Sequence, residues 1–150
     1  MATKTTTPQQ EMEEAVDELF REYCRKDDGR MNTMCNPQLV RCDFEKKSLT
    51  LKYDVKDWMM NPLEVMHGGV VATVFDLTMG MLARLLYGRI MPTTQMAVTY
   101  LRPVPDGSTF LVEAVCVMQG KTICVINAES WIEAKPDKLT ATSTGTYFAG

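Results

Sequence analysis

The segment from Asn61 to Gly88 constrains the fold of this chain more than any other. No proline occurs between Val70 and Tyr87, and a mostly apolar set of residues recurs at the three- and four-residue spacing of one helix face. This set consists of Val71, Val74, Phe75, Thr78, Leu82 and Leu85. Gly88 stands where a helix would stop. The segment therefore predicts a long helix that is too apolar to lie on a surface.

Two polar residues interrupt this segment, His67 at its start and Asp76 within it. An aspartate inside an apolar helix is costly unless it is paired, hydrated or used in chemistry. The two residues are nine positions apart, and at about 100° per residue they lie on opposite sides of a straight helix. We therefore do not expect His67 and Asp76 of one chain to face each other.

Small residues share the helix face of Asp76. The face comprises Gly69, Ala72, Thr73, Asp76, Gly80 and Ala83, and it would let another element approach closely. Asp76 lies about 10 Å along the axis from the first free amides, at about 1.5 Å per residue, so one chain cannot place both on the same atom. Two antiparallel copies packed through this face would bring each Asp76 to the partner's Gly68 and the partner's Gly69. The pattern predicts a composite site between two chains.

These residues belong to a longer pattern. Asn61 is followed by His67-Gly68-Gly69, then by Asp76, and later by Thr93-Thr94 and Tyr100-Leu101-Arg102-Pro103. The pattern resembles hotdog-fold acyl-CoA thioesterases, in particular their phenylacetate-pathway and thioesterase-superfamily-member branch, over roughly residues 35–149. The resemblance implies an α+β hotdog fold, in which a curved antiparallel sheet wraps the long central helix.

The rest of the chain fits the same α+β class. Residues 1–8 are predicted to be a disordered lead, and 9–150 a single domain that begins with an amphipathic helix over about 9–26. We expect this helix to pack on the edge of the sheet, with partner binding as the alternative. Strands are predicted over 39–44, 48–55, 93–101, 109–118, 122–133 and 139–148. No βαβ alternation occurs, so one antiparallel sheet follows, and two such sheets can join edge to edge.

Composition bounds the classes of function. The chain has 150 residues, enough for one domain with a core, and its net charge of −3 argues against nucleic acid as the main partner. Asp76 and Arg84 interrupt the longest apolar run, so no membrane span is expected, nor is a signal peptide. The five cysteines show no CxxC spacing, and one histidine is present, so neither a structural metal nor a disulfide framework is expected. We predict reduced thiols in a cytoplasmic protein.

Hydrolysis of a thioester needs a base that activates water and donors that stabilise the oxyanion. Asp76 is the candidate base or nucleophile, with a buried dimer contact as its alternative role. The amides of Gly68 and Gly69 are candidate oxyanion donors, because the first amides of a helix are unpaired and carry partial positive charge. Alternatively, the two glycines only allow a sharp turn into the helix.

The resemblance implies roles for further residues. His67 would position the thioester rather than act as the sole base, or it would only cap the helix. Asn61 would orient the same region, or serve as a turn residue before Pro62. Thr93 would hold the attacking water together with Asp76. Thr94 is the alternative, and only one of the two fits because neighbouring residues of a strand face opposite sides.

Other residues are candidates for binding the substrate. The positive side chains that suit CoA phosphates are Arg102, Lys121, Arg89 and Arg84, and each has an ordinary surface charge as its alternative role. The twelve methionines suit an adaptable apolar acyl pocket, or a loosely specified core. Gly-x-Ser-x-Gly and nucleotide-binding glycine loops are absent. We expect no metal, and no cofactor apart from the CoA of the substrate.

The sequence therefore predicts an acyl-CoA thioesterase, a hydrolase that releases a free acid and CoA. The alternative is a non-enzymatic acyl-CoA-binding hotdog protein. Known regulators of that kind add a DNA-binding domain, and the residues before the predicted sheet are too few for one. A hotdog dehydratase or hydratase would need a different acid–base pattern around its histidine. Because the site needs two chains, we expect a homodimer or a homotetramer made from two dimers.

Overall fold

A single antiparallel sheet forms the framework of the molecule. The structure is a computed structural model that describes residues 6–148. Its strands are β1 (Gln38–Asp43), β2 (Ser48–Asp54), β3 (Thr93–Tyr100), β4 (Thr109–Gln119), β5 (Ile123–Ile132) and β6 (Leu139–Phe148). They pair in the order β1-β2-β4-β5-β6-β3, and every neighbouring pair is antiparallel. The predicted strands are confirmed to within one residue at their ends.

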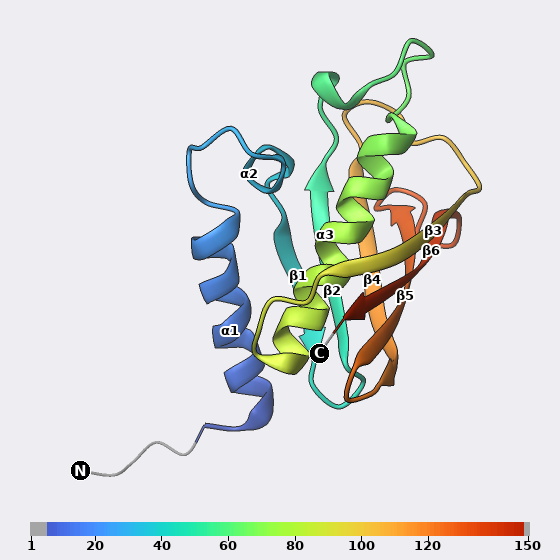
Figure 1. Cartoon of the computed structure of the whole chain (residues 1–150). Coiled ribbons are helices and arrows are strands. Elements are labelled where there is room, and N and C mark those ends of the chain that lie inside the picture. Colours follow the sequence, from blue (N-terminus) through green and yellow to red (C-terminus); the bar gives the residue numbers. More distant parts are fainter. Residues whose placement is uncertain (1–5, 149–150) are drawn as a thin grey trace.

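The long helix α3 (Gly68–Tyr87) lies in the curve of this sheet (Figure 1). It ends as predicted at Gly88, which has a φ of 67° and donates its N–H to the Arg84 carbonyl oxygen at 2.9 Å. Glycine adopts this φ without the steric cost that a side chain would add. The predicted apolar face is buried except at Leu85, which is half-buried, and neither Phe75 nor Leu82 has any exposed surface. α3 is thus the core helix around which the sheet curls.

By length and composition α3 would also be apolar enough to cross a membrane. In the part of the chain that the structure describes, it is the helix with this property, with a mean hydropathy of 1.5. Half of that stretch is buried inside the protein, as expected for a helix that a sheet wraps. Burial in the core explains the apolar composition, and the expectation of no membrane span stays a prediction.

The small-residue face of α3 is accessible in the single chain along most of its length. Gly69 is exposed, and four further members are half-buried: Ala72, Thr73, Asp76 and Gly80. The prediction is wrong for Ala83, which has no exposed surface and packs in the core. The accessible part of the face ends one turn earlier than the sequence pattern suggests.

The N-terminal helix α1 (Pro8–Tyr23) packs beside β1 and α3. Its start is capped, because the Thr7 hydroxyl accepts the Gln10 N–H at 3.3 Å and the Gln10 side chain accepts the Thr7 N–H at 2.9 Å. The prediction of a disordered lead over 1–8 is therefore wrong at its end, where a proline at the first helical position favours the helix. The remainder of that prediction, residues 1–5, lies outside the described residues.

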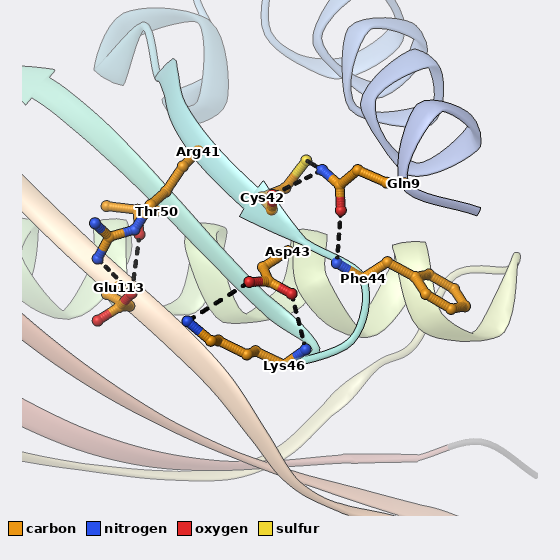
Figure 2. Close-up of polar contacts among 8 residues, drawn as sticks. All are labelled: Gln9, Arg41, Cys42, Asp43, Phe44, Lys46, Thr50 and Glu113. Atoms are coloured by element: carbon orange, nitrogen blue, oxygen red, sulfur yellow. Dashed lines mark hydrogen bonds and ion pairs between the residues drawn. The ribbon is translucent and has the colours of Figure 1, made fainter. Parts of the chain in front are cut away.

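The two edges of the sheet differ. At the β1 edge the carboxamide of Gln9, on α1, donates to the Cys42 carbonyl oxygen and accepts the Phe44 N–H, each at 2.9 Å (Figure 2). These are backbone groups on the outer side of an edge strand, and α1 thus covers this edge. β3 forms the other edge, and within residues 6–148 it pairs on one side only, with β6. One edge is closed by the chain itself and the other is open.

Two short helices were not predicted. α2 (Met31–Cys35) follows an exposed charged segment, residues 25–30, and buries Cys35. The 3-10 helix η1 (Asp57–Met59) lies in the loop before α3 and buries Met59. Helices of three to five residues are too short to show a helical period in the sequence. The formation of both short helices therefore depends on the residues that they pack against.

A buried pair of hydroxyl groups ties α3 to β2. The Tyr53 hydroxyl lies 2.7 Å from Thr78 Oγ1, and neither side chain has exposed surface. We expect Thr78→Val to lower the free energy of unfolding by about 1–3 kcal/mol, because it leaves the Tyr53 hydroxyl buried with weaker pairing. Urea unfolding of Thr78→Val, Tyr53→Phe and the double variant measures this. If the double variant loses the full sum of the single losses, the two hydroxyl groups are not coupled.

Candidate active site

The carboxylate of Asp76 is held by two hydroxyl groups. The Thr93 hydroxyl donates to Asp76 Oδ1 over 2.7 Å, and the Tyr147 phenol donates to the same oxygen over 3.4 Å. Thr93 and Tyr147 are register partners in β3 and β6, so the sheet places both beside the helix. Within residues 6–148 the second carboxylate oxygen, Oδ2, has no hydrogen-bond partner. Asp76 is thus oriented through one oxygen and free to react through the other.

Tyr147 is a site residue that the sequence reasoning missed. Burial raises the pKa of the Tyr147 phenol, and the negative charge of Asp76 raises it further, so the phenol keeps its proton as a donor. Gly145 makes room for the ring, because a Cβ at this position would meet Tyr147 at 3.0 Å and Met79 at 3.2 Å. Alternation along 139–148 places Tyr147 opposite the threonines of that strand. Nothing in the pattern indicates which turn of the helix it meets.

The start of α3 is arranged by His67. The side-chain Nδ1 of His67 accepts the Gly69 N–H at 2.9 Å, and the backbone N–H of His67 donates to the Met59 carbonyl oxygen at 2.7 Å. His67 therefore caps the helix, which was one of its two predicted roles. The Gly69 amide is consequently not a free donor, and that part of the prediction is wrong. The side chain that precedes the helix satisfies one of its first amides.

The Gly68 N–H, in contrast, donates to no group in the described chain, and it carries the partial positive charge of a helix N-terminus. The Tyr100 hydroxyl donates to the Gly68 carbonyl oxygen at 2.8 Å and fixes the peptide from the other side. A Cβ added at Gly68 would lie 3.4 Å from the Tyr100 ring, in ordinary contact. The Gly68 N–H is therefore held in place and left free to donate a hydrogen bond.

Asn61 orders the loop that leads into α3. Its Oδ1 accepts the N–H of Leu63 at 2.8 Å and of Val65 at 3.4 Å, and the loop returns to pair the Met66 N–H with the Val104 carbonyl oxygen. The side-chain amide nitrogen of Asn61 has no partner among the described residues. Asn61 thus acts as a turn residue through its oxygen and keeps its amide N–H groups available.

Asp76 and Gly68 line two different cavities. The first, which we call the helix-start cavity, has a volume of 360 Å³ and is lined by Gly68 and Asn61 among others. The second, the Asp76 cavity, has a volume of 320 Å³ and contains Asp76 and Thr93. The eight residues from Gly68 to Asp76 correspond to about 12 Å along the helix. One chain therefore separates the carboxylate from the free amide, as the sequence predicted.

Of the remaining predicted residues, one lines a cavity of the candidate site and two lie outside the site. The Arg102 guanidinium donates to the Leu139 carbonyl oxygen at 2.6 Å and lines the helix-start cavity beside Gly68. Thr94 is outside the site, because its hydroxyl donates to the Thr146 carbonyl oxygen; Thr93 is the residue that meets Asp76. Lys121 is also outside, in the turn after β4, where the neighbouring Gly120 carbonyl oxygen accepts the Tyr87 hydroxyl at the far end of α3.

The segment that carries these groups is also the segment that a family of known proteins shares. The family model of the thioesterase superfamily matches residues 63–139, from the loop before α3 to the start of β6. The chain belongs to the thioesterase superfamily. The match includes Gly68, Asp76, Thr93 and Arg102, whereas Asn61 and Tyr147 lie just outside its ends.

Solved structures of other proteins share the fold of this superfamily member. The Escherichia coli PaaI protein, from the phenylacetic acid degradation operon, is 16% identical with a TM-score of 0.80 and 95% of each chain covered. Zebra fish thioesterase superfamily member 2 is 21% identical with a TM-score of 0.79, covering 90% of this chain and 96% of that chain. A Streptococcus mutans protein solved with acetyl CoA bound is 26% identical with a TM-score of 0.69, covering 75% and 87%. These similarities confirm the predicted hotdog fold.

Proposed function

We propose that this chain is an acyl-CoA thioesterase that hydrolyses an acyl-CoA to a free acid and CoA. The observation that carries the proposal is that two chemically complementary groups line two separate cavities of the chain. A carboxylate with a free oxygen lines one cavity, and a free helix amide lines the other. Thioester hydrolysis needs both groups at one carbonyl, the first to activate water and the second to stabilise the oxyanion.

Two copies of the chain would complete the site. The small-residue face of α3 is accessible around Asp76, and the β3 edge of the sheet is open. Pairing through β3 and through this face would place two α3 helices side by side and antiparallel, and would remove an exposed edge. Each Asp76 would then approach the partner's Gly68. This assembly is a homodimer at minimum, and two such dimers would give the homotetramer expected from the sequence.

Each residue has a defined role in the proposed reaction. Asp76 Oδ2 takes a proton from water, the water oxygen bonds to the thioester carbon, and the carbonyl oxygen becomes an oxyanion. The partner's Gly68 donates its N–H to that oxyanion, with the helix dipole behind it. Thr93 and Tyr147 hold the carboxylate through Oδ1. The C–S bond then breaks, and the departing CoA thiolate receives the proton from Asp76.

Two further residues would bind the substrate. The free amide N–H groups of Asn61 can donate to the thioester region, since Asn61 lines the same cavity as Gly68. Arg102 is exposed in that cavity and is suited to a CoA phosphate. His67 would act through the helix start that it caps, because its Nδ1 is occupied.

A panel of acyl-CoA thioesters with detection of the released thiol tests the proposal. We expect at least one acyl-CoA to release CoA in proportion to the concentration of enzyme, with an equal amount of free acid. Binding of acyl-CoA without release of thiol from any member would contradict the enzyme proposal. That outcome would favour the alternative, a non-enzymatic acyl-CoA-binding protein.

A further inference from the structure

The Asp76 cavity extends along α3 from the carboxylate to Arg84. Both side chains line it, and they lie eight residues apart on the same helix, about 12 Å along its axis. Between them the lining is mainly apolar, with Leu77, Met81 and Met91 among the residues that contact the cavity. The cavity therefore has a reactive carboxylate at one end, an apolar middle and a guanidinium at the other end.

Arg84 is incompletely paired. Its Nε is buried without a hydrogen-bond partner, the one such side-chain nitrogen or oxygen among the described residues. The ion pairs of residues 6–148 join Arg30 to Asp28, Arg41 to Glu113 and Lys46 to Asp43, and none includes Arg84. A buried donor on a charged group is unfavourable when unpaired. This donor points to a missing acceptor.

No described residue supplies an acceptor to Nε itself, although the Tyr23 hydroxyl lies close to the guanidinium. Tyr23, from α1, and Asn32, from α2, also line the cavity, and both side chains are neutral, so neither balances the charge of the guanidinium. Arginines in the last turn of a helix often serve its C-terminal carbonyl groups. Such a role would use the guanidinium on the helix itself, whereas Arg84 lines the cavity and leaves Nε unpaired.

We propose that Arg84 binds an anionic group, a carboxylate, at the end of the acyl chain remote from the thioester. The preferred substrates would then be monothioesters of dicarboxylic acids with CoA. This inference rests on the proposed function and names its substrate class. A guanidinium forms strong paired hydrogen bonds to a carboxylate, and the apolar middle of the cavity accepts the methylene chain.

The size of the cavity limits the length of that chain. A volume of 320 Å³ corresponds to about ten groups of about 30 Å³ each. A six-carbon dicarboxylic acyl group has about nine non-hydrogen atoms, six carbons and three oxygens, and therefore fits. The CoA phosphates are a second source of anionic oxygen, but the pantetheine arm separates them from the thioester, which would lie beside Asp76. They would therefore lie outside this cavity.

The test compares adipoyl-CoA, which carries a remote carboxylate, with hexanoyl-CoA, which has the same chain length and none. We expect wild-type kcat/KM to be about tenfold or more higher for adipoyl-CoA, the effect of one charge-assisted pair. Arg84→Met should remove this preference, mainly by raising KM for adipoyl-CoA. Lys138→Met removes one positive charge from the exposed turn before β6 and should keep the preference.

Binding decides the inference independently of turnover. Calorimetry with non-hydrolysable thioether analogues of the two acyl-CoA compounds should show the same tenfold preference and its loss in Arg84→Met. Equal binding of both analogues by the wild type would overturn the assignment, even if hydrolysis is observed. An Arg84→Met variant that weakens both analogues equally would place Arg84 on a CoA phosphate or in the structure, and would also overturn it. Should Arg84→Met not fold, Arg84→Lys should reduce the preference several-fold, because lysine lacks the planar paired donors.

Discussion

Asp76→Asn is expected to lower kcat for acyl-CoA hydrolysis by about a hundredfold or more, with little change in substrate binding. The carboxamide keeps the shape of the side chain, and its oxygen can still accept from Thr93 and Tyr147. It cannot take a proton from water at neutral pH. Steady-state kinetics measures kcat, and the affinity for a non-hydrolysable thioether analogue measures substrate binding.

Asp137→Asn is the matched control, because it makes the same change at an exposed turn outside both cavities. An Asp76→Asn variant within a few-fold of wild type would falsify the base role and leave Asp76 as a packing residue. A single turnover in ¹⁸O-water separates base from nucleophile. A base directs the label into the acid at once, whereas an acyl-aspartate intermediate attacked at the aspartate carbon leaves the first acid unlabelled.

Mixed dimers of Asp76→Asn and Gly68→Pro chains are expected to regain about half of the wild-type activity per dimer, although each homodimer is nearly inactive. If Asp76 works with the partner's Gly68, one site of the mixed dimer receives both defects and the other receives neither. If both groups came from one chain, every site would carry one defect and no activity would return. The mixed species is isolated with two affinity tags and assayed against both homodimers.

The helix start should tolerate this proline. Gly68 is the first helical residue, where proline is favoured, and His67 has a φ of −60° and a ψ of 133°, which suits the residue before proline. Gly68→Ala is the matched control, since it adds a Cβ and keeps the N–H; it should stay near wild-type activity. Light scattering must show dimers or tetramers for each species. An active monomer would rule out the shared site, as would an inactive mixed dimer.

Several features followed from the sequence because they depend on local chemistry. The helical period of the apolar residues and the glycine at position 88 predicted α3 and its end. Alternation in some segments, and apolar runs bounded by turn residues in others, predicted the six strands. Helix geometry alone separated Asp76 from Gly68 by a fixed rise, and the two residues do line different cavities. The cytoplasmic location and the absence of a cofactor stay predictions from the sequence.

Other features depend on how distant segments meet, and only the tertiary structure decided them. The irregular register between Thr93 and Gln95 accompanies the choice of Thr93 rather than Thr94 as the residue that meets Asp76. The pairing of β3 with β6 brings Tyr147 to the same carboxylate. The orientation of the His67 side chain lets its Nδ1 accept the Gly69 N–H and leaves the Gly68 N–H without a partner. The candidate role of Arg84 also came from the tertiary structure. Its Nε is buried and unpaired because α1, α2 and α3 pack around it, and the sequence does not show this packing.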